Sequence, residues 1–316
     1  MKTWFITGAS RGFGSLVAER ALTKGDNVVA TARNPKTISE RLGDRPNLLV
    51  VALDVANEEQ ATAAAKAAID RFGGIDVLIN NAGFGLMGAV EEASAAEIEA
   101  VYRTNVFGLL TVSRAVLPYM RKARSGRIFN ISSIGGYRGA TGFGIYSSTK
   151  FAVEGLSEAM HDELAPLGIH VTVVGPGYFR TDFLDASSLS VSSRKIPDYE
   201  ATAGKVRTVA GGLNHNQPGD PSKLADVLVA FADAPNPPVR LPLGSDTVAA
   251  IEAKHKADSL ILFGVAESLV VDGLLTLERT TCSLNPKISN PQTNPQFVVL
   301  GNLCAVWHSP RCSKLL

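Results

Sequence analysis

The chain has 316 residues, of which 45% are hydrophobic, 19% charged and 7% aromatic, and its formal net charge is +1. This composition is typical of a folded globular protein and excludes a disordered chain. The small net charge excludes bulk attraction to nucleic acid or an anionic membrane, and no apolar run is long enough to predict a membrane-spanning helix. The three cysteines, Cys282, Cys304 and Cys312, all lie in the last 35 residues and do not form a disulfide framework. Because the N-terminus also shows no secretory signal, we expect a cytoplasmic protein.

Short apolar runs alternate with amphipathic helical patterns along most of the chain. Several of the runs are apolar without alternation, which is typical of strands covered on both faces. Strand followed by helix, repeated in this way, predicts an α/β fold with one doubly wound parallel sheet. Strands are predicted at 3–7, 28–31, 48–53, 77–79, 127–131 and 170–174, with helices between them such as 15–24, 58–72 and 151–164.

A glycine-rich turn, Gly8-Ala9-Ser10-Arg11-Gly12-Phe13-Gly14, connects the first predicted strand to the first predicted helix. Such a turn lets the backbone approach a pyrophosphate, and the helix N-terminus offers free N–H groups to it. The spacing is G-x-x-x-G-x-G, and taken alone it also fits a tight turn that binds nothing. Its position at the mouth of the first helix favours a dinucleotide site.

The second predicted strand ends in Ala32-Arg33, and no carboxylate follows before Glu40. An NAD site usually places Asp or Glu there, about 20 residues after the glycine turn, to bind the ribose 2′-hydroxyl. Arg33 and Arg11 instead offer two cations, which suit the 2′-phosphate of NADP. We therefore predict NADP(H) in preference to NAD, the alternative being that both arginines are simply solvated.

Tyr146 and Lys150 lie four residues apart at the start of a predicted helix, so they share one helix face. A free phenol has a pKa of about 10, and lowering it by ~3 units requires about 4 kcal/mol. A cation at ~4 Å and an effective dielectric constant of ~20 supplies about this energy. The pair therefore predicts a general acid/base, although the spacing alone also fits an ordinary aromatic residue and a solvated lysine.

In combination these motifs are more specific than any one of them. The glycine turn is followed by Asn80-Asn81-Ala82-Gly83, by Ser133 thirteen residues before Tyr146, and by Pro176-Gly177 after the sixth predicted strand. In this order they resemble the short-chain dehydrogenase/reductase family of short-subunit type, over about four fifths of the chain. The resemblance implies a Rossmann-type fold and an NADP(H)-dependent oxidoreductase. Such an enzyme interconverts a carbonyl and a secondary alcohol, here on a small to medium apolar substrate.

The resemblance also implies roles for individual residues. Tyr146 matches the general acid/base, and Lys150 matches the residue that lowers its pKa and binds the nicotinamide ribose. Ser133, rather than its neighbour Ser132, matches the hydroxyl that holds the substrate carbonyl, and Asn105 matches the anchor of a water molecule. The implied cofactor contacts are Asp54 and Val55 at the adenine, Asn81, Ala82 and Gly83 at the adenosine ribose, and Pro176, Gly177, Phe179 and Thr181 at the nicotinamide, where Phe179 replaces the small residue often found there.

Three further expectations concern the rest of the chain. We predict that 1–256 forms the catalytic domain, that 182–216 is a substrate lid that is mobile without ligand, and that 257–316 is an irregular C-terminal extension. The five histidines show no metal-ligand spacing, so we predict no metal site; Cys304, His308 and Cys312 supply only three ligands. By the family resemblance we expect a homodimer or homotetramer. The alternative function is a regulator of the same fold that senses NADP without chemistry.

Overall fold

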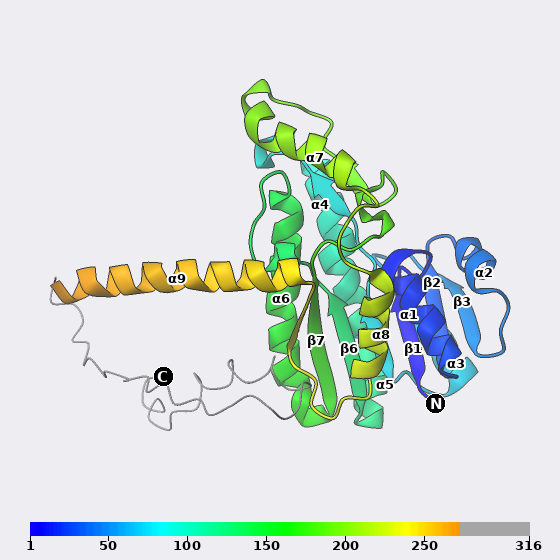
Figure 1. Ribbon diagram of the computed structural model, residues 1–316. Coiled ribbons are helices and arrows are strands. Elements are labelled where there is room, and N and C mark those ends of the chain that lie inside the picture. The colour runs from blue at the N-terminus through cyan, green and yellow to red at the C-terminus, as the bar shows by residue number, and fades with distance from the viewer. Residues whose placement is uncertain (272–316) are drawn as a thin grey trace, which may run out of the picture. The chain divides into compact units, whose positions relative to one another are not determined.

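The computed structural model describes residues 1–271, and residues 1–261 form one compact unit with helices on both faces of a sheet (Figure 1). Within the described residues the main sheet has seven strands in the order β3-β2-β1-β4-β6-β7-β9, and every pair is parallel. The predicted doubly wound α/β fold is confirmed. The strands are β1 (Thr3–Thr7), β2 (Asn27–Ala32), β3 (Leu48–Ala52), β4 (Val77–Asn80), β6 (Gly126–Ile131), β7 (Ile169–Pro176) and β9 (Arg240–Leu243), and a second parallel pair joins β5 (Gly85–Met87) to β8 (Leu189–Val191).

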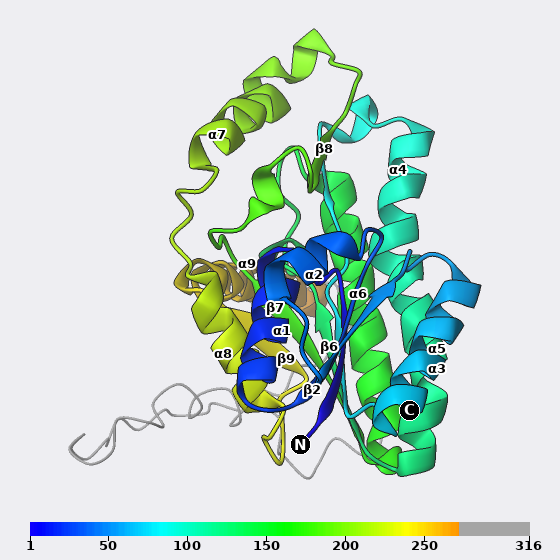
Figure 2. The same cartoon turned by 90° about the vertical axis from the view of Figure 1, so that its right-hand side faces the viewer.

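Two apolar layers cover the sheet, one on each face. Figure 2 shows helices on both sides of the sheet. Helices α1, α2 and α8 contribute to the first, and α3, α5 and α6 contribute to the second. Strands β1, β2 and β4 send alternate side chains into each layer, which is why their sequences are apolar without a polar face. The helices are α1 (Gly12–Thr23), α2 (Lys36–Leu42), α3 (Glu58–Phe72), α4 (Ala95–Tyr102), α5 (Gly108–Ala123), α6 (Gly144–Leu164), α7 (Lys205–Leu213), α8 (Pro221–Phe231) and α9 (Ser245–Val271).

Local signals explain where the predicted helices begin and end. Helix α3 spans the predicted range because the Asn57 side chain caps it, accepting a hydrogen bond from the Gln60 N–H at 2.9 Å. Gly73, with a φ of 81°, ends it. Strand β9 was not predicted from the sequence, because its four residues include Pro242 and lie at the edge of the sheet.

The predicted lid begins after β7 and is more ordered in secondary structure than its polar sequence indicates. It contains β8 and α7, and Figure 1 shows α7 beyond the end of the sheet at which the parallel strands finish. Helix α7 contains the β-branched residues Val206, Thr208 and Val209 and the pair Gly211-Gly212, all of low helix propensity, so the sequence does not predict it.

The C-terminal part of the chain is described only as far as Val271. Helix α9 passes through Lys256 and Ala257 without a break, so the predicted boundary at 256 is not an end of secondary structure. The rest of the predicted extension, with its three cysteines and His308, lies outside the described residues. Among the helices described up to Val271, none is long and apolar enough to span a membrane.

Candidate active site

The glycine turn lies where β1 passes into α1, at the carboxyl end of the sheet. Gly8 and Gly12 have positive φ values of 64° and 55°, which favour glycine. Gly14 is required for packing instead, because a Cβ atom there would lie 2.5 Å from the Gly8 carbonyl oxygen and 2.6 Å from Asn81 Nδ2. These glycines let the turn fold tightly against the segment that follows β4, and leave its backbone open to a ligand.

Asn81 holds this arrangement together. Its Nδ2 donates to the carbonyl oxygens of Thr7 and Gly8, both at 3.0 Å. The Thr7 hydroxyl, which is buried, accepts from the N–H groups of Asn81 and Ala82 at 3.0 Å. Sequence reasoning missed Thr7, although its place as the last residue before the glycine turn was visible. These hydrogen bonds join the glycine turn and the Asn81-Ala82-Gly83 segment into one unit.

Tyr146 and Lys150 lie in the first two turns of α6, and both side chains are buried. Lys150 Nζ is 5.7 Å from the centre of the Tyr146 ring, and it donates to the carbonyl oxygen of Ile131 at 2.8 Å. The phenol ring is also flanked by Phe183, with ring centres 5.4 Å apart, and by Phe143 at 6.3 Å. The helix therefore brings the two predicted side chains together, as their spacing indicates.

The expected lowering of the Tyr146 pKa does not arise from the protein's own groups. Burial raises the pKa of Tyr146 to about 12, while the Ser133 hydroxyl acts in the opposite direction. Burial also lowers the pKa of Lys150 to about 8, against the attraction of Glu154. The expected lowering counted only the attraction of the nearby cation, whereas in the fold both charged forms lose water, and this desolvation dominates. Tyr146 is therefore a protonated hydroxyl at neutral pH.

Ser133 and Ser132 follow β6 but point to different places. The Ser133 hydroxyl accepts from the Gly135 N–H at 3.0 Å, and a Cβ on Gly135 would be 3.5 Å from both this hydroxyl and Tyr146 Cε1. Ser132 is buried against Gly136, where a Cβ would meet its hydroxyl at 2.4 Å. Ser133 is thus the serine whose hydroxyl converges with Tyr146.

Asn105 lies in a π-helical turn, Arg103–Phe107, between α4 and α5. Such turns are rare and frequently occur at functional sites. Its Nδ2 donates to Phe84 O and Thr149 Oγ1, and its Oδ1 accepts from Phe84 N. A Cβ on Gly83 would lie 3.0 Å from Asn105 Oδ1 and 3.7 Å from Lys150 Nζ. The amide therefore lies below Gly83, beside the lysine.

A cavity of about 760 Å³ joins these groups. Its volume lies within the range usual for small-molecule and cofactor sites. Gly14 and Asn105 do not line it but support residues that do. The predicted site residues on its wall are Gly8, Ser10, Arg11, Gly12, Phe13, Arg33, Asp54, Val55, Asn81, Ala82, Gly83, Ser133, Tyr146, Lys150, Pro176, Gly177, Phe179 and Thr181.

The family model described as short chain dehydrogenase matches residues 2–190, more than half of the chain. The chain belongs to the short-chain dehydrogenase/reductase family. It is 41% identical over 249 residues to oxidoreductase BOA17 of Botryotinia fuckeliana, covering 78% of this chain and 90% of that protein. It is also 41% identical over 252 residues to a 3-ketodihydrosphingosine reductase of Bacteroides thetaiotaomicron, covering 80% and 91%. This short-chain dehydrogenase is an oxidoreductase that acts on CH–OH and C=O groups with a nicotinamide cofactor.

Solved structures of the same fold contain NAD in one case and NADP in another. A short-chain dehydrogenase from Streptomyces avermitilis superposes with a TM-score of 0.77 at 37% identity, covering 86% of this chain and 99% of that one. A short-chain dehydrogenase/reductase from Burkholderia phymatum, in complex with NAD, has a TM-score of 0.70 at 25% identity, covering 82% and 94%. The protein ElxO, with NADP bound, has a TM-score of 0.63 at 27% identity, covering 78% and 99%.

The two arginines predicted to bind a 2′-phosphate differ in their exposure and in their hydrogen-bond partners. Arg33 is exposed on the cavity wall and, among the described residues, has no ionic partner. Arg11 instead points to the lid, where its Nε donates to the Ser188 hydroxyl at 3.1 Å and its guanidinium also donates to the Ser187 carbonyl. The fold therefore leaves Arg33 free and engages Arg11 as a contact between the glycine turn and the lid.

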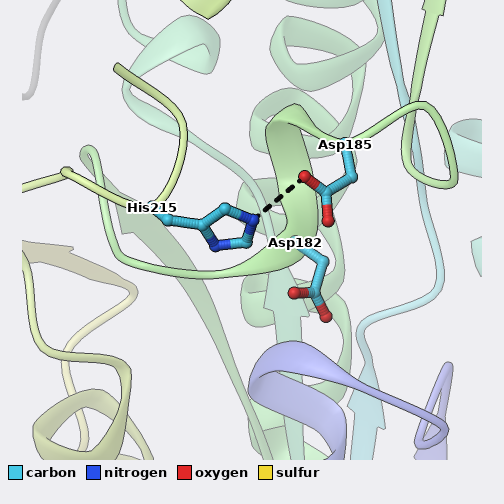
Figure 3. Close-up of side chains that lie close together, drawn as sticks. All are labelled: Asp182, Asp185 and His215. Atoms are coloured by element: carbon cyan, nitrogen blue, oxygen red, sulfur yellow. Dashed lines mark ion pairs between the residues drawn. The ribbon is translucent and has the colours of Figure 1, made fainter. Parts of the chain in front are cut away.

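The two ends of the lid meet at Asp182, Asp185 and His215 (Figure 3). His215 Nε2 lies 3.2 Å from Asp185 Oδ1, and Asn214 donates to the same carboxylate. Sequence reasoning missed this cluster, because 30 residues separate Asp185 from His215. One nitrogen or oxygen atom from each of the three side chains lies within 4.8 Å of the other two. Because Asp185 and His215 lie near opposite ends of the lid, the contact between them closes its base.

Proposed function

We propose that the protein is an NADP(H)-dependent reductase and dehydrogenase that interconverts a ketone and a secondary alcohol on a small to medium apolar substrate. The observation that carries the proposal is the convergence of Tyr146, Ser133 and Lys150 on the cavity that the glycine turn also lines. A bound nicotinamide supplies or accepts the hydride in such a reaction.

The residues then have separate tasks. In the reductive direction the Ser133 hydroxyl donates to the carbonyl oxygen, and Tyr146 transfers its proton to that oxygen as negative charge develops. A Tyr146 pKa of about 12 makes the phenol a proton donor throughout the neutral range. The Lys150 ammonium stabilises the phenolate that remains, because opposite charges attract strongly where water is excluded.

Asn105 fits a role in returning the proton. Both Nδ2 hydrogens are used within the protein, while Oδ1 accepts one hydrogen bond and keeps a second lone pair. That lone pair lies on the Lys150 side of Gly83 and suits a water molecule between the amide and the ammonium. Lys150 and this water then connect Tyr146 to solvent.

Arg33 supports the choice of NADP over NAD. Its guanidinium is exposed on the cavity wall after β2, where an acidic residue would select the 2′-hydroxyl of NAD. The apolar lining near Tyr146, including Phe143, Phe183 and Leu184, supports an apolar substrate. The similarity to a relative named as a keto reductase supports the reductive direction.

The proposal is tested with purified protein, NADPH and a panel of cyclic and open-chain ketones. We expect oxidation of NADPH that depends on a ketone, and at least a thousandfold slower turnover in Tyr146→Phe with unchanged NADPH binding. A wild-type protein that binds NADPH but reduces no member of the panel, with Tyr146→Phe binding it equally, would favour the regulator that senses NADP without chemistry.

A further inference from the structure

Glu154 is a buried acid in the middle of α6 to which the mechanism above assigns no task. Only 7% of the residue is exposed, and it lies one helical turn after Lys150. Residues four apart share one face of a helix, so the two side chains are neighbours. Because a buried carboxylate is costly without partners, the groups around Glu154 must account for an acid at this position.

The side chains of Lys150 and Glu154 reach two consecutive residues at the end of β6. Lys150 Nζ donates to the carbonyl oxygen of Ile131 at 2.8 Å, and the Glu154 carboxyl lies beside the hydroxyl of Ser132. Gly136 packs closely against both, since a Cβ there would lie 3.0 Å from the Lys150 carbonyl oxygen and 3.1 Å from Glu154 Cγ. The ammonium and the carboxyl are therefore close to each other in a buried part of the fold.

Two other charged groups face Glu154, namely Arg240 of β9 and Glu158 on the next turn of α6. Arg240 Nη2 lies 2.6 Å from Glu158 Oε1, whereas Arg240 Nε lies 3.8 Å from Glu154 Oε2, so the closer partner of the arginine is the exposed Glu158. The Tyr146 phenol, one turn before Lys150, carries no charge at neutral pH. Arg240 thus balances the charge of Glu154 only in part, and this charge acts on the Lys150 ammonium.

The pKa shifts of the two groups agree with this arrangement. Burial lowers the pKa of Lys150 to about 8, and the attraction of Glu154 acts against this lowering. Burial raises the pKa of Glu154, as does Glu158, while Ser132, Arg240 and Lys150 act in the opposite direction. Because these three partners favour the charged form, the carboxyl is ionised in the alkaline range where Lys150 loses its proton.

We infer that Glu154 is a positioning residue, whose carboxylate keeps Lys150 in its ammonium form while the Tyr146 phenolate forms. Glu154 does not line the cavity, so it touches neither substrate nor coenzyme and acts through Lys150. The inference rests on the proposed function, in which the Lys150 ammonium stabilises that phenolate. It follows that removal of this one negative charge lowers the pH at which Lys150 loses its proton.

The test measures the ionisation of Lys150 in two ways on the full chain. The first is the pH profile of kcat for ketone reduction, read as the midpoint of its alkaline fall. The second needs no turnover, because Lys150 lines the cavity and can be reached by a small reagent. The protein without coenzyme is labelled with acetic anhydride over a series of pH values, and mass spectrometry of the peptide that contains Lys150 gives the fraction of neutral, reactive amine.

Four variants separate the charge of Glu154 from its packing. Glu154→Gln removes the charge and keeps the shape, and Glu154→Met removes it with an apolar chain of similar length. Glu154→Asp keeps the charge. Glu158→Gln is the matched control, because it removes an exposed acid of the same helix that contacts the same Arg240.

We expect Glu154→Gln and Glu154→Met to move both midpoints to lower pH together, by about one pH unit. Their kcat should be about fivefold below that of the wild type at pH ~8 and within about twofold of it at pH ~6. Glu154→Asp should keep both midpoints near the wild-type values. Glu158→Gln should move them by less than about 0.3 pH unit, since solvent screens an exposed charge.

Two results would overturn the inference: unchanged midpoints in the charge-free variants of Glu154, even if kcat or Tm falls at every pH, or an equal shift of the midpoints in Glu158→Gln. Either leaves the proposed function standing, because the wild type still reduces ketones. A wild-type protein that reduces no ketone would instead overturn the proposed function, while the labelling midpoints still show whether Glu154 controls the charge of Lys150.

Discussion

Arg207 of the lid forms an ion pair with Glu92, whose carboxylate is buried, at 2.6 Å between Nη1 and Oε2. The hydrogen bond from Arg207 does most to lower the pKa of the Glu92 carboxyl to about 2. Glu92 also accepts from the N–H groups of Ile196 and Ala89, which lower this pKa further. Glu97 accepts from Ser193 N–H, and Glu91 from the Tyr199 hydroxyl. The segment before and within α4 thus fastens the far side of the lid.

Arg207→Met is expected to loosen the lid. It leaves the Glu92 carboxylate buried without its cation, which costs about 3 kcal/mol. We expect faster proteolysis between residues 192 and 213, a lower Tm and a KM raised more than kcat is lowered. Arg20→Met serves as the control, because it removes an exposed pair with Asp226 and costs less than about 1 kcal/mol. Equal protease sensitivity in the two variants would refute this role of the pair.

Ser133→Ala and Ser132→Ala form a matched pair of neighbouring variants. The Ser133 hydroxyl converges with Tyr146, so its loss should lower kcat about 100-fold with little change in coenzyme affinity. The Ser132 hydroxyl lies against Gly136 and beside the Glu154 carboxyl, so its loss should change kcat less than threefold. Steady-state kinetics on the two proteins decide the assignment, and the reverse order would transfer the role to Ser132.

We expect the ionisation of Lys150 to determine the alkaline limb of the pH profile of kcat for ketone reduction, that is, the pH above which kcat falls. Its pKa is lowered to about 8, so the stabilising ammonium is present below this pH and is lost above it. Tyr146, with a pKa near 12, remains protonated across the same range and does not produce the limb. Lys150→Arg keeps the charge and should move the limb to higher pH, although kcat falls through the changed geometry. The measurement is kcat as a function of pH, and a limb near pH 8 in both proteins would exclude Lys150 as its source.

Arg33→Asp is expected to exchange the coenzyme preference. The carboxylate repels a 2′-phosphate and accepts from a 2′-hydroxyl, so NADPH affinity should fall at least tenfold while NADH affinity rises. Arg41→Asp, at an exposed arginine in the last turn of α2 and away from the cavity wall, is the control for net charge. If the Arg33 variant keeps the wild-type ratio of the two Kd values, Arg33 does not read the phosphate.

Gly14→Ala and Gly155→Ala separate a packing glycine from an open one. At Gly14 the new Cβ would lie 2.5 Å from the Gly8 carbonyl oxygen, so the turn must shift and both the Tm and NADPH affinity should fall. At Gly155, inside α6, a Cβ meets nothing within 4 Å, and alanine should stabilise the helix by up to about 1 kcal/mol. Calorimetry gives both values. A Gly14→Ala protein as stable as wild type would show that the turn tolerates a side chain.

The sequence by itself determined the first six strands of the main sheet and their alternation with helices, because apolar periodicity and glycine positions are local properties that precede any tertiary contact. It also determined the pairing of Tyr146 with Lys150, since four residues on one helix bring two side chains to the same face. The glycine turn could be predicted for the same reason, because neighbouring residues in the sequence define its position between β1 and α1.

Tertiary structure alone decided where Arg11 points and which residues close the lid. Glu92 and Arg207 are 115 residues apart, and Asp185 and His215 are 30 apart, so no local pattern connects them. Tertiary structure also reversed the expected pKa shift of Tyr146, because desolvation depends on how the whole chain excludes water around a group. The hydrophobic periodicity of a segment indicates which of its side chains are buried. The contacts of a buried side chain are determined only when distant segments fold together.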